Sequence, residues 1–297
     1  MYHQPALLHE CIEGLSINPS GIYADLTFGG GGHSRAIIEK LGSEGRLIAF
    51  DQDEDALLNA IDDERFTLAN ENFRYLKNFL RLYKAFPIDG ILADLGISSH
   101  QIDTPQRGFA TRFDGPLDMR MGRKQGVTAA QMINSYPEDK LFSVFKMYGE
   151  ISNARMLAAK IVEARSNPIT TTNELKEAIK PCTPLNYESK YLAQVFQAIR
   201  IEINDEMGAL QAMLKQCADV LKPGGRLVII SYHSLEDRLV KNYIKTGNFE
   251  GVVEKDFFGN KLTPLLSITR KPITPSESEL KSNPRSRSAK LRIAKKN

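Results

Sequence analysis

Short apolar runs alternate with helical patterns over the first hundred residues of the chain. The runs read as strands and lie at residues 21–27, 45–53, 66–73 and 88–99. The segments between them, at residues 34–42, 54–61 and 75–84, have the spacing of helices. Strands alternating with helices predict a parallel sheet covered on both faces. Right-handed crossovers make that sheet doubly wound, with its ligand crevice at the carboxyl ends of the strands.

The next clear strand comes only at residues 225–234, after a helix predicted over residues 205–221 and the breaker pair Pro223 and Gly224. The gap is about 130 residues, whereas a crossover unit needs roughly 30. Its first part, residues 103–126, has no apolar period and predicts a long loop. The rest is helical in period, with Thr128 and Thr172 as expected caps. We therefore expect an α/β core from residues 1–102 and 204–297, and an inserted loop and helical substrate-recognition domain at residues 103–203.

The composition is that of a soluble globular protein, with 42% hydrophobic and 25% charged residues. No apolar stretch reaches the roughly 18 residues of a membrane span, and the start does not have the layout of a signal peptide. We expect a cytoplasmic protein with no membrane partner. The three cysteines Cys11, Cys182 and Cys217 are widely separated, which predicts buried free thiols, and no cluster has metal-ligand spacing.

Basic charge is concentrated at the end of the chain. The net charge is +3, but residues 281–297 hold seven basic side chains and no acidic one, so the preceding residues sum to −4. Such a block is typical of an arm that contacts phosphates. The same segment also alternates Ala289, Leu291 and Ile293 with charged positions, which predicts a half-buried strand. Both interpretations stand: a terminal strand whose exposed face is basic, with or without a role in binding nucleic acid.

A glycine-rich segment, DLTFGGGGH at residues 25–33, joins the first strand to the first helix. Consecutive glycines allow a ligand to approach the backbone and the open N-terminus of the helix. Asp51 ends the second strand, twenty residues beyond Gly31, where a carboxylate can hold the ribose of an adenosine group. A tight turn without a ligand is the alternative. The spacing fits the dinucleotide pattern GxGxxG poorly, and LKPGGRL at residues 221–227 resembles a turn of class I methyltransferases, which favours S-adenosylmethionine over a nicotinamide cofactor.

Five motifs in one order carry a more specific resemblance. They are TFGGGGHS, DGILADLGISS, RGFATRFDGPLDMRM, SYHSLEDRLVK and NPRSRSAKLRIAKK. Together they resemble the bacterial small-subunit rRNA cytosine-N4 methyltransferases of the RsmH (MraW) type over nearly the whole chain. The resemblance implies S-adenosylmethionine as methyl donor and a cytidine N4 amine in the decoding region of 16S rRNA, within the small ribosomal subunit, as substrate. One position departs from the family loop GRGGH, because Gly30 stands where the arginine is common, which puts any contact from that arginine in doubt.

Carried over position by position, the resemblance implies a set of cofactor-binding residues: Gly31, Gly32, His33, Asp51, Phe73, Asp94 and Gln101. The residues themselves support part of this set. Phe73 follows the third strand, where a ring can stack on adenine, although a core phenylalanine is the commoner explanation. Asp94 terminates an apolar strand at the expected crevice, where an unpaired charge is costly to desolvate.

Asp94 is also our candidate catalytic residue. The cytosine amine must attack the methyl group and lose a proton, and a carboxylate can accept its N–H bonds. The strand reads DLGISS and lacks the prolines and aromatic ring with which many amino-group methyltransferases hold the target. A ring that stacks on the base must therefore come from elsewhere, and Phe109, Phe113 and Tyr232 are the candidates.

Two further segments leave alternatives open. Ser234 and Asp237 form a capping-box pattern, while His233 before them is equally compatible with a contact to substrate or cofactor. The loop at residues 103–126 combines Phe109 and Phe113 with basic and acidic side chains, namely Arg107, Arg112, Arg120, Arg123, Lys124, Asp114 and Asp118. One interpretation is a surface that binds RNA, and the other is a loop held together by Arg–Asp ion pairs. A single loop can serve both purposes.

The predicted fold is a class I, Rossmann-like methyltransferase with a doubly wound, mostly parallel sheet and an inserted all-helical domain. The predicted enzyme is an S-adenosylmethionine-dependent rRNA cytosine-N4 methyltransferase. Three alternatives remain: a methyltransferase acting on another base or on DNA, a binding module that has lost catalysis, and an NAD-dependent oxidoreductase. The sequence predicts no oligomeric state.

Overall fold

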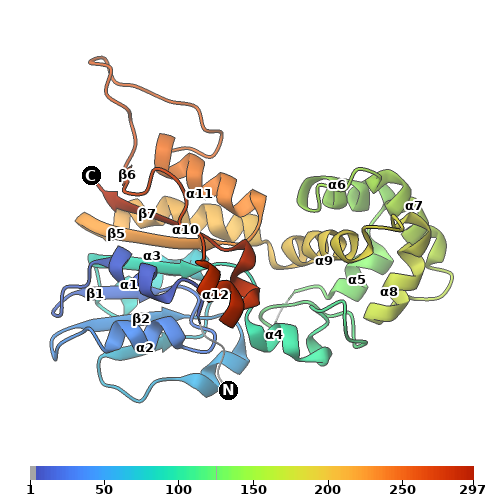
Figure 1. Cartoon of the computed structure of the whole chain (residues 1–297), viewed down its shortest axis with the longest axis horizontal. Coiled ribbons are helices and arrows are strands. Elements are labelled where there is room, and N and C mark those ends of the chain that lie inside the picture. The colour runs from blue at the N-terminus through green and yellow to red at the C-terminus, as the bar shows by residue number, and fades with distance from the viewer. Residues whose placement is uncertain (1–4, 125) are drawn as a thin grey trace. The chain divides into compact units, whose positions relative to one another are not determined.

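The chain divides into two compact units in the computed structural model, which describes residues 5–124 and 126–297 (Figure 1). The α/β unit comprises Met1–Gly96 and Gly208–Asn297, and the helical unit comprises Ile97–Met207. The first four residues of the chain and Gln125 of the expected loop lie outside the described residues. The helical unit begins six residues before the expected insertion and ends four residues after it.

Seven strands form one sheet in the described part of the α/β unit, in the order β3-β2-β1-β4-β5-β7-β6. They are β1 (Ile22–Asp25), β2 (Arg46–Phe50), β3 (Phe66–Ala69), β4 (Ile88–Asp94), β5 (Leu221–Ser231), β6 (Leu265–Ser267) and β7 (Lys290–Lys296). The strands β1 to β5 pair in parallel, and β7 is antiparallel to both of its neighbours. This arrangement confirms the predicted doubly wound, mostly parallel sheet.

Helices cover both faces of this sheet (Figure 1). The helical segments are α1 (Leu8–Leu15), α2 (Gly32–Ile38), η1 (Glu54–Asn59), η2 (Phe73–Tyr75), α3 (Leu76–Leu82), α10 (Glu206–Val220), α11 (Ser234–Thr246), α12 (Glu277–Ser282) and η5 (Pro284–Ser288). Apolar side chains of α3, α10 and α11, such as Leu80 and Met213, pack with one set of strand residues. Those of α1 and α2, such as Leu15 and Ile37, pack with the alternate set. Burial of both faces explains why the strands are continuous apolar runs.

The helical unit has a hydrophobic core of its own, which includes Leu141, Phe145 and Leu157. Its segments are α4 (Ser99–Asp103), η3 (Pro105–Arg107), α5 (Ala129–Ser135), α6 (Glu138–Tyr148), α7 (Ala154–Ala164), α8 (Thr172–Ile179), η4 (Lys180–Cys182) and α9 (Glu188–Asn204). Thr128 caps α5 as predicted. The prediction of Thr172 as a cap was wrong by one residue, because Thr171 caps α8 and pairs with Glu174 at the third helical position.

Local structure departs from the sequence pattern at three places. The helix expected from residue 54 is a 3₁₀ segment. The helix α4 was not predicted, although Ser98 and Gln101 form its capping box, and the strand expected to reach residue 99 ends at Asp94. The strand β5 begins at Leu221 and runs through Pro223, because the expected turn is an irregularity in its pairing with β4.

Candidate active site

The carboxyl ends of β1, β2 and β4 each carry an aspartate, and these strands are neighbours in the sheet. Asp25 and Asp94 are the last residues of β1 and β4, and Asp51 directly follows β2. Phe73 begins η2, four residues after the neighbouring strand β3. Because the carboxyl ends of parallel strands meet at one edge, these four residues gather at the crevice where a doubly wound sheet binds its ligand.

Asp25 is fully buried and links the first strand to the first turn of α2. Its carboxylate accepts a hydrogen bond from the Ser34 hydroxyl at 2.6 Å and another from the Thr27 N–H at 3.1 Å. Burial raises the pKa of Asp25 to about 6, and these hydrogen bonds oppose the rise. Asp25 is not among the site residues predicted from the sequence, although a charged residue inside an apolar run is a usable signal of a site.

Asp51 organises the glycine loop. One of its carboxylate oxygens accepts the N–H of Gly29 at 2.7 Å, and the other accepts the N–H of Asp53 at 2.9 Å. Burial is the main reason why the pKa of Asp51 is raised to about 6. Each oxygen has a second lone pair, so the carboxylate is still able to accept the hydroxyls of a bound ribose.

The loop glycines are required by the local geometry. Gly31 has φ +75°, and a Cβ there would lie 2.9 Å from the ring of Phe28. At Gly32 a Cβ would lie 2.3 Å from the side chain of Pro5. Arg35 from the same helix donates to the Gly30 carbonyl at 2.6 Å, so this loop has a guanidinium contact although Gly30 itself has no side chain.

His33 is buried, and its ring points away from solvent toward the interior of the unit. Its Nε2 atom lies 3.1 Å from the carbonyl oxygen of Ala6, and its Nδ1 atom lies 3.9 Å from Oδ2 of Asp94. Burial lowers the pKa of His33 to about 4, so the imidazole is neutral at pH 7 and the contact with Asp94 is not an ion pair.

Asp94 is held by groups from two directions. The Tyr232 hydroxyl donates to its Oδ1 at 2.8 Å, and its backbone N–H donates to the hydroxyl of Thr27 at 2.7 Å. Its side chain remains 22% exposed. Burial raises the pKa of Asp94 to about 7; the bond from Tyr232 opposes this rise, and the negative charges of Asp25 and Glu236 add to it. A carboxyl group of this kind exchanges a proton near neutral pH, as a general base must.

No lysine or arginine forms an ion pair with Asp25, Asp51 or Asp94 within residues 5–96 and 208–297. Three carboxyl groups at one sheet edge create a negative potential there. A ligand that carries positive charge is therefore favoured at this edge, whereas the pyrophosphate of a dinucleotide is disfavoured.

Gln101 lies in the helical unit, on α4. It is buried, and its amide oxygen accepts the N–H of Ser98 in the capping box. At least part of its hydrogen-bonding capacity thus stabilises α4. The other six residues implied by the resemblance all belong to the α/β unit.

Hydrogen bonds and ion pairs within the loop at residues 103–126 hold it together. Arg107 is almost fully buried and donates to the carbonyls of Arg120 and Met121, while Arg120 forms two 2.9 Å hydrogen bonds to the carboxylate of Asp118. Arg112 contacts Asp103 and covers the ring of Phe113. Of the two candidate rings in this loop, Phe109 is buried and Phe113 is partly covered. The interpretation of a loop held together by its own contacts therefore accounts for Arg107, Arg112 and Arg120.

The cap of α11 differs from the prediction by one residue. His233 is the N-cap and Glu236 closes the capping box, so the assignment of Ser234 and Asp237 to that role was wrong. Asp237 is instead available for an ion pair with Arg292, at 2.6 Å from its Nε atom.

The basic tail forms a strand, as predicted, but β7 is an inner strand and is not half-buried, because the four successive residues 291–294 are all buried. Its exposed face is less basic than expected, because Arg292 is buried against Asp237 and the Lys296 ammonium donates to the Leu221 carbonyl.

The prediction of buried free thiols is confirmed for all three cysteines.

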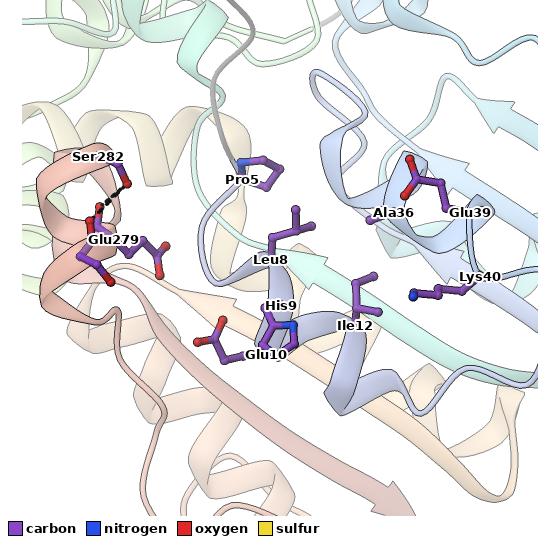
Figure 2. Close-up of a pocket in the computed structure, with 11 residues that line it drawn as sticks. Pro5, Leu8, His9, Glu10, Ile12, Ala36, Glu39, Lys40, Glu279 and Ser282 are labelled. Carbon is purple, nitrogen blue, oxygen red and sulfur yellow. Dashed lines mark hydrogen bonds between the residues drawn. The ribbon is translucent and has the colours of Figure 1, made fainter.

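A hollow of about 480 Å³ lies elsewhere in the α/β unit, between α1, α2 and α12. Figure 2 shows Leu8 and Ile12 within it and the carboxylates of Glu39 and Glu279 on opposite sides. Its lining comes from helices and their flanks and includes no strand end. Its lining therefore includes none of the three aspartates Asp25, Asp51 and Asp94.

None of the described helices combines the length and the apolar character that crossing a bilayer requires.

The fold and the aspartate-lined edge define a doubly wound α/β protein with a site for a cationic adenosine-type ligand.

The chain belongs to the MraW methylase family, whose model matches residues 1–297. It is 58% identical over 296 residues to "Ribosomal RNA small subunit methyltransferase H" of Flavobacterium johnsoniae, covering 99% of this chain and 98% of the relative. Relatives of the same name from Bacteroides thetaiotaomicron and Parabacteroides distasonis are 56% and 57% identical, each over 99% of this chain and 97% of the relative.

Proposed function

We propose that this chain transfers a methyl group from S-adenosylmethionine to the N4 amine of a cytidine in the decoding region of 16S rRNA, acting in the cytoplasm on the small ribosomal subunit. The observation that carries the proposal is Asp94, a partly exposed carboxyl group at the end of β4 with no lysine or arginine partner in the described α/β unit. Membership of the MraW methylase family supports the reaction class, and the names of the relatives support the substrate.

The residues present fit S-adenosylmethionine. Its sulfonium and ammonium groups are positive, and the edge that holds Asp25, Asp51 and Asp94 provides three carboxyl groups to complement them. Asp51 would accept the ribose hydroxyls, Phe73 would lie beside the adenine, and the backbone around Gly31 would approach the ligand closely. When bound, this cofactor supplies an electrophilic methyl group on sulfur.

Asp94 has the properties of a group that accepts the N–H bonds of the target amine. The amine lone pair is delocalised into the cytosine ring, so a carboxylate that accepts these hydrogen bonds favours the attacking geometry. The amine must also release a proton, and a carboxyl group with pKa near 7 is able to take it. Positioning of the two reactants provides the remainder of the rate enhancement.

The central experiment is methyl transfer from labelled S-adenosylmethionine to small subunits and to naked rRNA from a strain that lacks this protein. Mass spectrometry of the labelled nucleoside should identify N4-methylcytidine and show which form of the substrate is accepted. Label in another base, or only in DNA, would contradict the proposal. Cofactor binding without transfer to any nucleic acid would favour the non-catalytic alternative, and binding of NADH in preference to S-adenosylmethionine would favour the oxidoreductase.

A matched control tests whether cofactor binding and methyl transfer depend on the carboxyl end of β4 in particular. Asp89 lies near the other end of β4 and is paired with Lys222 at 2.8 Å. Its replacement by Asn should leave cofactor affinity and methyl transfer close to wild type. Equal losses in D89N and D94N would show that the strand as a whole, and not its carboxyl end, is what matters.

A further inference from the structure

Tyr232 approaches Asp94 from the end of β5. This residue directly follows the strand, and its backbone N–H donates to the Glu236 carboxylate at 2.8 Å, which fixes its place at the start of α11. Its hydroxyl donates to Oδ1 of Asp94 at 2.8 Å. Burial raises the pKa of Tyr232 far above its ordinary value, so the phenol stays protonated and acts on Asp94 as a hydrogen-bond donor.

His33 approaches the other oxygen of the same carboxyl group. A carbonyl oxygen can only accept a hydrogen bond, so the 3.1 Å contact with Ala6 requires the proton of the neutral imidazole to be on Nε2. Nδ1 then carries a lone pair. It faces Oδ2 of Asp94 at 3.9 Å.

The two oxygens of Asp94 therefore have opposite environments. A donor at Oδ1 stabilises the ionised carboxylate. A lone pair near Oδ2 repels the ionised form but attracts the acid, because an Oδ2–H group can donate to Nδ1 once the two atoms approach by about 1 Å. The acid proton thus belongs on Oδ2.

We propose that Tyr232 and His33 are positioning residues that give the two oxygens of Asp94 separate tasks: Tyr232 fixes Oδ1 as an acceptor, and His33 makes Oδ2 the oxygen that receives the proton of the target amine. This inference rests on the proposed role of Asp94. As the amine nitrogen bonds to the methyl carbon, the carbon–sulfur bond breaks and its electron pair remains on sulfur. The nitrogen then loses one proton to Oδ2, keeps the N–H electron pair, and Asp94 becomes neutral.

The titratable groups that face Asp94 come from every neighbouring element of the α/β unit. They are Asp25 at the end of β1, His33 on α2, Cys11 on α1, Tyr232 after β5 and Glu236 on α11. Asp25 and Glu236 both favour the protonated acid. Neither distinguishes Oδ1 from Oδ2 through a hydrogen bond, so the asymmetry is due to Tyr232 and His33.

The test measures the pKa of Asp94 directly in the ligand-free chain, by carbon-13 NMR of labelled aspartate with D94N to assign the signal. Tyr232→Phe removes only the hydroxyl that stabilises the carboxylate, so the pKa should rise by about one unit, a tenfold change in the protonation equilibrium. His33→Gln retains an N–H that can reach Ala6 but lacks Nδ1, so the pKa should fall by about one unit. A general loss of packing would not shift the two variants in opposite directions.

Tyr243→Phe is the matched control, because this tyrosine is buried on α11 and stacks on Phe249 away from Asp94. It should leave the pKa of Asp94 unchanged. Shifts of the same sign in Y232F and H33Q, or no shift in either, would overturn the inference. If H33Q does not fold, nitrogen-15 NMR of the wild-type chain still tests the inference, because it shows which ring nitrogen of His33 carries the proton. A proton on Nδ1 would contradict the inference. These readouts do not need methyl transfer, so failure of the proposed function would be seen separately.

Discussion

Aspartates occur in two regions of this chain under opposite conditions. In the loop of the helical unit, Asp118 is paired with Arg120, and this pairing outweighs burial and lowers the pKa of its carboxyl group. At the sheet edge of the α/β unit, Asp51 and Asp94 have no such partner in that unit, and burial raises their pKa values to about 6 and about 7. Burial of carboxyl groups that lack a cationic partner costs stability, which makes such groups candidates for binding a ligand that carries positive charge.

The largest effect is expected at Asp94. Replacement by Asn keeps the size of the side chain but removes the ability to accept a proton. We expect kcat for methyl transfer to fall by roughly 10²- to 10⁴-fold, the usual contribution of a general base. Cofactor affinity, measured by calorimetry, should change much less than kcat. A D94N enzyme with wild-type kcat would show that the proton leaves by another route.

Replacement of Asp51 should affect the binding of S-adenosylmethionine more than the rate of methyl transfer. Asp51→Asn leaves one acceptor oxygen where two N–H groups and the ribose compete for acceptors, and it removes a negative charge from the edge. The dissociation constant for S-adenosylmethionine should rise by about ten- to a hundredfold, since hydrogen bonds to a charged group are worth about 1.5–3 kcal/mol each. An unchanged constant would mean that Asp51 serves only to fold the glycine loop.

The pH dependence of binding and of stability should have opposite signs. Because the folded-state pKa values of Asp25, Asp51 and Asp94 lie above the ordinary value of 3.8, these three groups hold more protons in the folded chain than in the unfolded chain between about pH 4 and 7. The lowered pKa of His33, about 4, has the opposite effect below about pH 6.5, but it involves one proton against three. The free energy of unfolding of the ligand-free chain should therefore fall as the pH rises through this window. Affinity for the cationic cofactor should increase over the same range, since binding favours the ionised carboxylates.

Chemical denaturation and calorimetry between pH 5 and 8 measure both slopes. In D94N the stability slope should be shallower near pH 7, because one of the three groups no longer titrates. Cofactor affinity that falls as the pH rises would contradict the assignment of a cationic ligand to this edge.

The sequence predicted the sheet well because both of its faces are buried, so the strands are mostly apolar runs such as IDGILAD, which forms β4. It also predicted the position of Asp51 and Asp94 at strand ends, since each lies at the end of such a run. It did not predict the contacts of Tyr232 and His33, which join residues separated by 138 and 61 positions along the chain and depend on side-chain orientation.

Caps and ion pairs were the least predictable features, because neighbouring polar residues compete for the same role. His233 and Ser234 both precede α11, and a shift of one residue decides whether Asp237 caps a helix or pairs with Arg292. Sequence alone also could not show that Arg107, Arg112 and Arg120 make their contacts within the loop, since pairing with a neighbouring aspartate and binding of a phosphate require the same composition.

The smallest effect is expected from breaking a paired aspartate in the loop. Arg120→Ala removes the two hydrogen bonds to Asp118, but both side chains are about one-fifth exposed, so water replaces part of the lost interaction. We expect the free energy of unfolding to fall by at most about 1 kcal/mol, with cofactor affinity unchanged. The residual effect should shrink in high salt, which screens the pair. A large loss of methyl transfer to RNA with unchanged stability would instead show that Arg120 contacts the substrate, and the loop would then serve for binding as well as for its own folding.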